Sequence, residues 1–208
     1  MEVLMKKNLN CLCGGNFSID MEEEIDLDSE PEYIDKILNG TFMSFTCPHC
    51  GKKHKPEHKL TVLWKSKKLK LEVLPELDRG EFYRKKKTAQ NSETVIGFPE
   101  MADRLAVIKD DLEPVIIETL KSYLLAKAEE NYPDNEINAW YHCKSSSGIE
   151  FHLDGIRADE VAVMRIPFEV YEKTREDYLK HPKNDNFAQL RVGSYLSIQN
   201  LMRPNIYK

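Results

Sequence analysis

Two short cysteine turns constrain the fold of this chain more than any other feature. Cys11-Leu12-Cys13-Gly14 and Cys47-Pro48-His49-Cys50-Gly51 hold four of the five cysteines, and a glycine follows each pair. Two thiolates can share an ion about 2.3 Å from each sulfur only if the backbone between them curls back, and the glycine supplies the dihedral angles of such a turn. Two such turns that meet build a tetrahedral Zn²⁺ site. The sequence therefore predicts a zinc centre with Cys11, Cys13, Cys47 and Cys50 as ligands.

The first turn leaves the ligand set open. It is a C-x-C turn, whereas C-x-x-C is the commoner spacing, and Asn10 stands three residues before Cys13. Either both sulfurs reach the ion, or His49, His54 or His58 replaces one of them. Unrelated free thiols and a redox C-x-x-C motif are the other interpretations, but the redox motif leaves the first pair without a role. With four protein ligands the site has no open position, so we expect the zinc to be structural.

The order of these motifs resembles that of the CpXC family. The chain has C-x-C-G, then a long insertion, then the segment 39–52, NGTFMSFTCPHCGK. The similarity continues through 95–101 and 112–121, where such proteins have a turn and two helices, and it spans about residues 8–130. The first turn departs from the Cys-Pro-x-Cys pattern, with Asn10 where the family has its leading cysteine. The resemblance implies a zinc-ribbon-like arrangement and no particular activity.

Length and composition predict a globular protein. A chain of 208 residues forms one large domain or two small ones and buries about 70% of its unfolded surface, so it does not need zinc for want of a core. It has no run of about 18 apolar residues, and its first residues lack the apolar core of a signal peptide. We therefore expect a cytoplasmic protein with no membrane partner, in which thiols stay reduced and favour metal over disulfide.

Charge is distributed in blocks. The net charge of −5 argues against a dedicated nucleic-acid binder, yet residues 20–32 hold eight acids and residues 52–70 hold eight lysines. The basic block could bind phosphates, or the two blocks could lie side by side in one sheet and neutralise each other, which we favour. The phosphate-binding alternative is a nucleic-acid-binding zinc ribbon that uses Lys52, Lys53, Lys55, Lys59, Lys65, Lys67, Lys68 and Lys70.

Periodicity predicts an α+β fold. Strands are expected over 2–10, 17–21, 42–45, 58–65, 69–74, 137–143, 148–153 and 161–166. Ser29 and Glu32 suggest a capping box that starts a helix, 75–92 suggests an exposed connection, and 167–181 suggests a late helix. Apolar stripes after Phe98 and Ile116 predict two helices that form a hairpin against the sheet.

These elements predict a zinc-ribbon-like β-module with a helix-bearing insertion, packed on the helical hairpin and followed by a C-terminal α+β part. We place the first domain at 1–130 and the C-terminal part at 131–208. Nucleotide-binding, metalloprotease and serine-hydrolase motifs are absent from the sequence. His142 and Cys143 are neighbours on a predicted strand and should point to opposite faces, so they form no catalytic pair. We expect a non-catalytic scaffold or interaction module with an unidentified protein partner.

Overall fold

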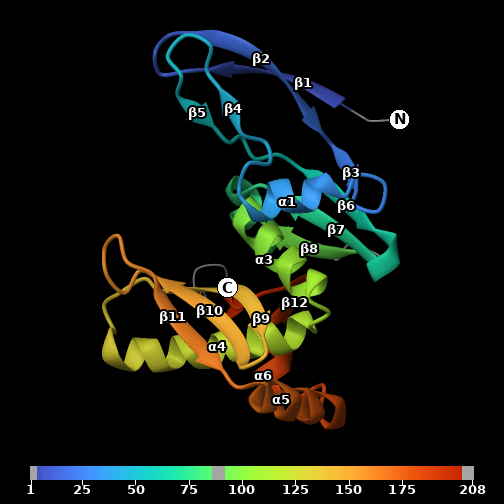
Figure 1. The fold of residues 1–208 in the computed structure, drawn as a ribbon, viewed down its shortest axis with the longest axis vertical. Coiled ribbons are helices and arrows are strands. Elements are labelled where there is room, and N and C mark those ends of the chain that lie inside the picture. The colour runs from blue at the N-terminus through green and yellow to red at the C-terminus, as the bar shows by residue number, and fades with distance from the viewer. Residues whose placement is uncertain (1–3, 86–91, 203–208) are drawn as a thin grey trace. The chain divides into compact units, whose positions relative to one another are not determined.

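The computed structural model describes residues 4–85 and 92–202 and confirms the α+β fold class. The chain divides into two compact units, Met1–Ala102 and Asp103–Lys208. This division lies before the boundary that we placed at 130/131, and it assigns the whole of the second long helix, residues 114–131, to the C-terminal unit. Figure 1 shows the elements of each unit in order along the chain.

Two hairpins in the first unit carry the cysteine turns. Strands β1 (Leu4–Asn10) and β2 (Asn16–Glu22), close to the two strands predicted there, pair antiparallel up to the pair Asn10–Asn16. A smaller hairpin joins β4 (Phe45–Thr46) to β5 (Lys53–His54). The tips of the two hairpins lie together in Figure 1. The strand predicted over 42–45 is wrong except at its last residue, because Met43 has a φ of 51°, which breaks an extended strand.

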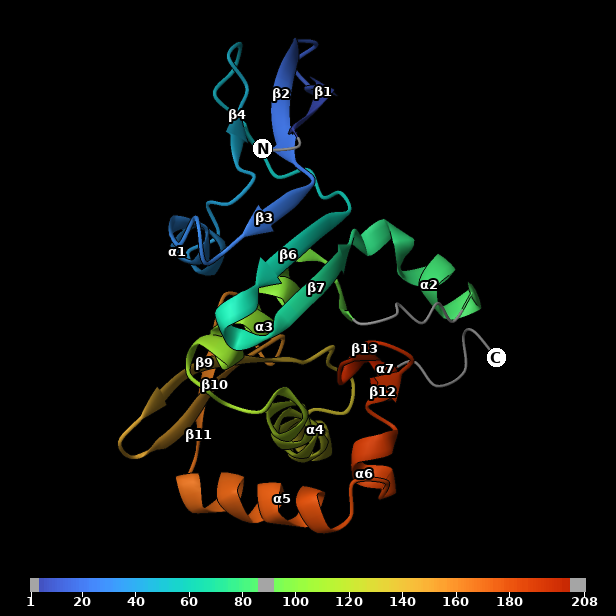
Figure 2. The same ribbon diagram turned by 90° about the vertical axis from the view of Figure 1, so that its right-hand side faces the viewer.

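A mixed sheet forms the body of the first unit. Its strands β3 (Glu24–Asp26), β6 (Leu60–Trp64), β7 (Leu69–Leu74) and β8 (Glu93–Ile96) are neighbours in the order β8-β7-β6-β3. The β6–β7 pair is antiparallel and is connected by the 3-10 turn η1 (Lys65–Lys67), while β3–β6 and β7–β8 are parallel. Alternate residues of β6 and β7 are buried, and helix α1 (Glu32–Leu38) buries Tyr33 and Ile37. Figure 2 shows β3, β6 and β7 side by side.

Two predicted features of this unit are wrong. Helix α1 has no capping box, because the Ser29 hydroxyl donates to the backbone oxygen of Asp26 and Pro31 occupies the N-cap position. Residues 76–85 are not an open connection: they form the 3-10 helix η2 (Glu76–Asp78) and helix α2 (Arg79–Lys85). The rest of that predicted connection, 86–91, lies outside the described residues.

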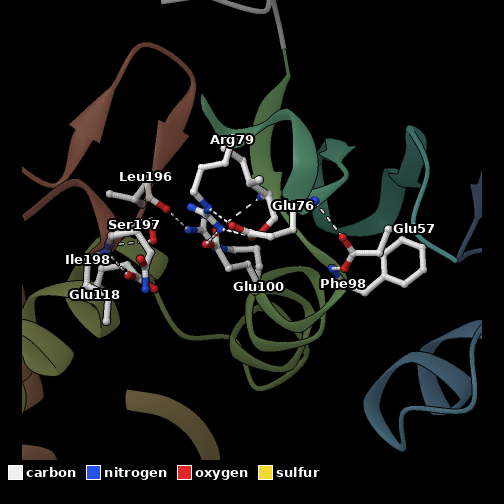
Figure 3. A network of polar contacts seen from close by, with 12 residues as sticks. Glu57, Glu76, Arg79, Phe98, Glu100, Glu118, Leu196, Ser197 and Ile198 are labelled. Carbon is white, nitrogen blue, oxygen red and sulfur yellow. Dashed lines mark hydrogen bonds and ion pairs between the residues drawn. The ribbon is translucent and has the colours of Figure 1, made fainter. Parts of the chain in front are cut away.

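Buried polar contacts fix α2 and the start of α3 (Phe98–Lys109) within the first unit. The Arg79 guanidinium, 5% exposed, binds the carboxylates of Glu76 at 2.5 Å and Glu100 at 2.8 Å (Figure 3). Glu57 accepts hydrogen bonds of 2.8 Å from the backbone N–H groups of Phe98 and Glu76. Its carboxylate therefore supplies an acceptor at the helix start that no local motif provides.

The C-terminal unit places helices against a three-stranded antiparallel sheet. The sheet order is β11 (Ala162–Ile166), β10 (Gly148–Asp154), β9 (Asn138–Ser145), close to the three strands predicted from the sequence. Helices α4 (Pro114–Asn131) and α5 (Phe168–Lys180) were also predicted. The short elements that follow are α6 (Asp185–Ala188), β12 (Arg191–Val192), β13 (Tyr195–Leu196) and α7 (Gln199–Met202).

Helix α4 supplies the centre of the C-terminal core. Ile116, Ile117 and Leu120 are buried together with Ile149 and Phe151 of β10. We expected α4 to pack on the N-terminal β-module as half of a helical hairpin, but its apolar face takes these partners from the C-terminal sheet instead. The apolar pattern of α4 predicts that one face of the helix is buried, but it does not specify which sheet packs against that face.

An ion cluster is buried beside this core. The Lys121 ammonium, 3% exposed, binds the carboxylate of Asp103 and lies 2.8 Å from that of Glu118. Glu118 also accepts a 2.7 Å hydrogen bond from the backbone N–H of Ile198 (Figure 3), and Asp103 accepts one from the backbone N–H of Tyr141. These partners satisfy charges that would otherwise be costly to bury.

Candidate metal centre

The structure brings all four predicted cysteines together. The Cys11 Sγ lies 3.6 Å from the Cys50 Sγ, and the Cys13 Sγ lies 3.8 Å from the Cys47 Sγ. All four sulfurs are within 4.8 Å of one another. These separations are far longer than the roughly 2.05 Å of a disulfide, and the four thiols are free.

Both turns are closed by equivalent backbone hydrogen bonds although one is shorter. In the second turn, the Gly51 N–H donates to the Cys47 oxygen and the Cys47 N–H donates to the Lys52 oxygen. In the first, the Gly14 N–H donates to the Cys11 oxygen and the Cys11 N–H donates to the Gly15 oxygen. The C-x-C turn is thus one residue shorter than the C-x-x-C turn but has the same pattern of backbone hydrogen bonds. Gly14 and Gly51 have φ values of +86° and +74°, which favour glycine.

The first cysteine of each turn is buried and the second is exposed. Cys11 and Cys47 are 6% and 1% exposed, whereas Cys13 and Cys50 face solvent. Burial alone would raise the pKa of Cys47, but the backbone N–H groups of His49 and Cys50 point at its sulfur and, with neighbouring thiols, lower its pKa to about 7. The N–H of Lys52 would lower the pKa of Cys50, yet contact with the neighbouring thiols raises it to about 12. The Cys47 thiol therefore ionises readily, whereas the Cys50 thiol needs a cation beside it to ionise.

The dimensions of the cluster fit a tetrahedral ion. Four sulfurs about 2.3 Å from one Zn²⁺ lie about 3.8 Å apart along the edges of a tetrahedron. The two measured pairs, at 3.6 and 3.8 Å, match that edge. Four sulfur donors in this arrangement suit Zn²⁺ or an iron ion and do not suit Ca²⁺ or Mg²⁺. The cluster could therefore hold a metal ion.

None of the three alternative histidines joins the four sulfurs in the described part of the chain. His49 packs on the backbone of Gly15, where a Cβ atom would lie 2.3 Å from its ring. His54 packs edge-on against Phe17. The His58 Nε2 lies 2.5 Å from the backbone oxygen of Glu22, and the ring contacts Phe98. Through its contact with Gly15, His49 of the second turn packs against the first turn.

The acidic and basic blocks lie side by side, as we favoured from the sequence. Strand β3 of the acidic block pairs with β6 of the basic block, and the Lys65 ammonium lies 2.5 Å from the Asp26 carboxylate. Other lysines of the basic block are also engaged: Lys59 with Asp78, Lys70 with Glu72, Lys55 with the Gly40 oxygen, and Lys67 with the Trp64 ring. Many lysines of the basic block therefore already have interaction partners within the first unit.

Sequence reasoning missed a second group of potential ligands in the C-terminal unit. Ligand atoms of His142, Glu150 and His152 lie within 4.8 Å of one another. Glu150 and His152 are two residues apart on β10 and share a face. Across the ladder, Glu150 pairs with Cys143 and Phe151 with Tyr141, so His142 is the extra residue of a β-bulge. We assigned alternating faces to an unbroken strand, and the bulge changes that alternation at His142.

Both cysteine turns lie in a segment that matches a known protein family. A sequence model described as CpXC protein matches residues 9–121, more than half of the chain. The chain belongs to the CpXC family. The matched segment contains both cysteine turns, so the CpXC resemblance drawn from those turns is confirmed.

Similarity to one relative extends beyond the segment that matches the CpXC model. An uncharacterized protein of Treponema pallidum (strain Nichols) is 31% identical over 214 residues, which cover 93% of this chain and 97% of the relative. Both units of this CpXC protein therefore have counterparts in that relative. No solved structure matches the chain. Within residues 4–85 and 92–202, no helix has the length and apolar character needed to cross a membrane.

Proposed function

We propose that this CpXC protein is a zinc-binding interaction module, in which Cys11, Cys13, Cys47 and Cys50 hold one structural Zn²⁺. The observation that carries the proposal is the meeting of four sulfurs from two distant turns at tetrahedral spacing. The hairpins that bear these turns bury little apolar surface: most residues of β1 are exposed, and β4 and β5 have two residues each. An ion shared between their tips replaces the core that they lack.

A non-catalytic role follows from the same geometry. A zinc ion with four thiolate ligands keeps no position for water or substrate, so it neither activates water nor polarises a carbonyl group. In the second turn, the backbone N–H groups of His49, Cys50 and Lys52 point at sulfur and favour the thiolate forms of Cys47 and Cys50. We therefore assign the ion to folding and not to chemistry.

The exposed tip of the first hairpin is the surface that we propose for the partner. Leu12 stands between two of the four cysteines and is 90% exposed. A leucine held in solvent at the end of a metal-fixed turn suits insertion into an apolar pocket on another protein, because its position is set before binding. The basic block offers no equal case for nucleic acid, since many of its lysines contact groups within the first unit.

Metal content tests the first part of the proposal. Elemental analysis of protein purified without added metal should give one zinc per chain. Cys47→Ser should lower zinc content by at least tenfold, whereas Cys143→Ser, which removes a cysteine of the other unit, should leave it unchanged. Protein that folds with no bound metal would overturn the assignment.

A site-specific photocrosslinker tests the second part. Placed at Leu12 in cells, it should give a discrete protein adduct that disappears when Cys47→Ser is added. The matched control is Leu77, which is 96% exposed on the same unit and lies away from the cysteine turns. Equal crosslinking at both positions would remove the tip as the contact surface. An adduct to RNA or DNA at Leu12 would instead favour the nucleic-acid alternative.

A further inference from the structure

A second cluster of metal-ligating side chains lies on the sheet of the C-terminal unit. The His142 Nε2 is 3.9 Å and the His152 Nε2 is 3.7 Å from the same carboxylate oxygen, Oε1 of Glu150. The two imidazole rings stack, with centroids 3.8 Å apart and planes 16° apart. We propose that His142, Glu150 and His152 form a second metal site in this protein, one that takes a divalent transition-metal ion such as Zn²⁺, Ni²⁺ or Co²⁺.

The donor set selects the class of ion. Two imidazoles and one carboxylate oxygen suit Zn²⁺, Ni²⁺ and Co²⁺, whereas Ca²⁺ and Mg²⁺ require mostly oxygen ligands. Three protein ligands also leave coordination positions for water. This site thus differs in kind from the four-cysteine cluster, because it can exchange ligands and the other cannot.

The side chains need only small movements to share an ion. Ligand atoms about 2.1 Å from one metal lie roughly 3.0–3.4 Å apart, against the 3.7 and 3.9 Å observed. One ring must also turn out of the stack, since nitrogen lone pairs of parallel rings do not converge. The His142 and His152 side chains are 48% and 32% exposed, so solvent leaves them room to turn.

The carboxylate of Glu150 is already oriented for this role. Arg165 stands opposite Glu150 on β11, and its Nη2 donates a 2.9 Å hydrogen bond to Oε2. That contact fixes the carboxylate and directs Oε1 to the two imidazoles. Metal ligands are commonly held in this way by a hydrogen bond on the atom that does not bind the ion.

A nickel titration tests the site with the four-cysteine centre already filled. Protein loaded with zinc and dialysed should bind one further equivalent of Ni²⁺ by calorimetry, without release of zinc. The indole of Trp140 reports on the same event, because Trp140 pairs with His152 across the ladder and a nearby Ni²⁺ quenches its fluorescence. A Trp64→Phe background removes the signal of the buried tryptophan in the first unit.

Substitutions then assign the ligands. His142→Asn and His152→Asn should each weaken Ni²⁺ binding at least tenfold, because each removes one of three ligands. His181→Asn, an exposed histidine at the end of α5 in the same unit, should leave binding unchanged. Unchanged circular dichroism of the three variants shows that the effect is local.

Three results would overturn the second site. The first is the absence of Ni²⁺ binding beyond the zinc-filled centre. The second is binding that survives both His142→Asn and His152→Asn, and the third is binding that releases zinc and adds sulfur-to-nickel absorption, because in both cases the ion would lie elsewhere. The outcome is separate from that of the zinc proposal: a protein without zinc at its cysteines that still binds Ni²⁺ through these histidines would retain this inference alone.

Discussion

The two units of this protein reach order by different means. In the first, the hairpins β1–β2 and β4–β5 expose most of their side chains and meet at four sulfur atoms. In the second, β10 buries Ile149, Phe151 and Leu153 on one face against α4 and its neighbours. Only Ile19 and Met21 of these hairpin strands are buried, and hairpins with so small a buried face are marginal in water, whereas a sheet covered by helices supports itself. If the cysteines hold zinc as proposed, metal binding and hydrophobic burial act as alternatives within one chain.

Removal of the metal should give the largest difference in stability between the two units. The apparent free energy of structural zinc binding is on the order of 10–16 kcal/mol at neutral pH, and much of it is folding energy. A strong chelator should therefore abolish hydrogen-exchange protection in β1, β2, β4 and β5. Peptides of α4, β9 and β10 should keep theirs. Loss of protection in both units at the same chelator concentration would contradict the comparison.

Lys121→Met should give the reverse pattern with a smaller effect. It leaves the buried carboxylates of Asp103 and Glu118 without their cation, which costs about 3–5 kcal/mol. Urea unfolding should show this loss in the C-terminal unit, while zinc affinity stays at the wild-type value. A matched change at the surface, Lys183→Met, should be neutral.

The pH dependence of that loss has a definite sign. Burial alone would lower the pKa of Lys121, but Asp103 and Glu118 raise it above its ordinary value of 10.5. A group whose pKa rises on folding contributes its full stability below its unfolded pKa and loses it as pH rises through the folded pKa. The difference between wild type and Lys121→Met should therefore be constant from pH 7 to pH 10 and shrink above that. A difference that vanishes by pH 8 would mean that Lys121 is neutral in the folded protein.

Gly15→Ala should loosen the metal centre without touching a ligand. Its Cβ would lie 2.3 Å from the His49 ring, and such crowding costs about 1–3 kcal/mol. Zinc affinity, measured by chelator competition, should fall by roughly ten- to a hundredfold, since 1.4 kcal/mol is a factor of ten.

His49→Ala separates crowding from backbone strain in that experiment. It should restore most of the affinity lost in Gly15→Ala, because the clashing ring is gone. The matched control is Gly14→Ala, whose Cβ meets nothing but whose φ of +86° strains an alanine by about 1–2 kcal/mol. His49→Ala should not rescue that variant. Equal rescue of both would show that His49 acts on the turn by another route than contact with Gly15.

The sequence predicted what depends on local spacing and missed what depends on distant partners. The cysteine turns were recognisable because residues two or three apart must serve one centre, and the strand pattern of β6 and β7 follows from their alternation. The capping box failed because Ser29 bonds to the Asp26 backbone instead of the helix. Helix α2 was missed because Phe82 is its only buried apolar residue and Arg79 finds its partners at a distance.

The candidate sites show the same limit. From the C-x-C spacing alone, any of three histidines could have replaced Cys11 as a ligand. Only the three-dimensional arrangement shows that the Cys11 sulfur lies beside the other three cysteine sulfurs. The cluster of His142, Glu150 and His152 was not predicted because it includes a β-bulge residue, and no residue type in the sequence indicates that bulge. The short pattern Glu150-Phe151-His152 was visible, since it places two ligands on one face, but its third member could not be chosen without the register.

The smallest effect should come from the charges at the end of the β3–β6 pair. The Lys65 ammonium and the Asp28 backbone N–H lower the pKa of Asp26, so the pair stabilises the fold above the ordinary pKa of 3.8 and loses that contribution as pH falls below it. Between pH 6 and 8, Asp26→Asn should shift the melting temperature slightly and by a constant amount, and 1 M salt should reduce the shift because the Lys65 side chain is exposed. Asp134→Asn, an exposed acid of the other unit, is the control and should give no shift. A large shift that resists salt would mean that the two charged blocks hold the first unit together as firmly as its metal does, and the contrast between the units would then rest on charge as well as on zinc.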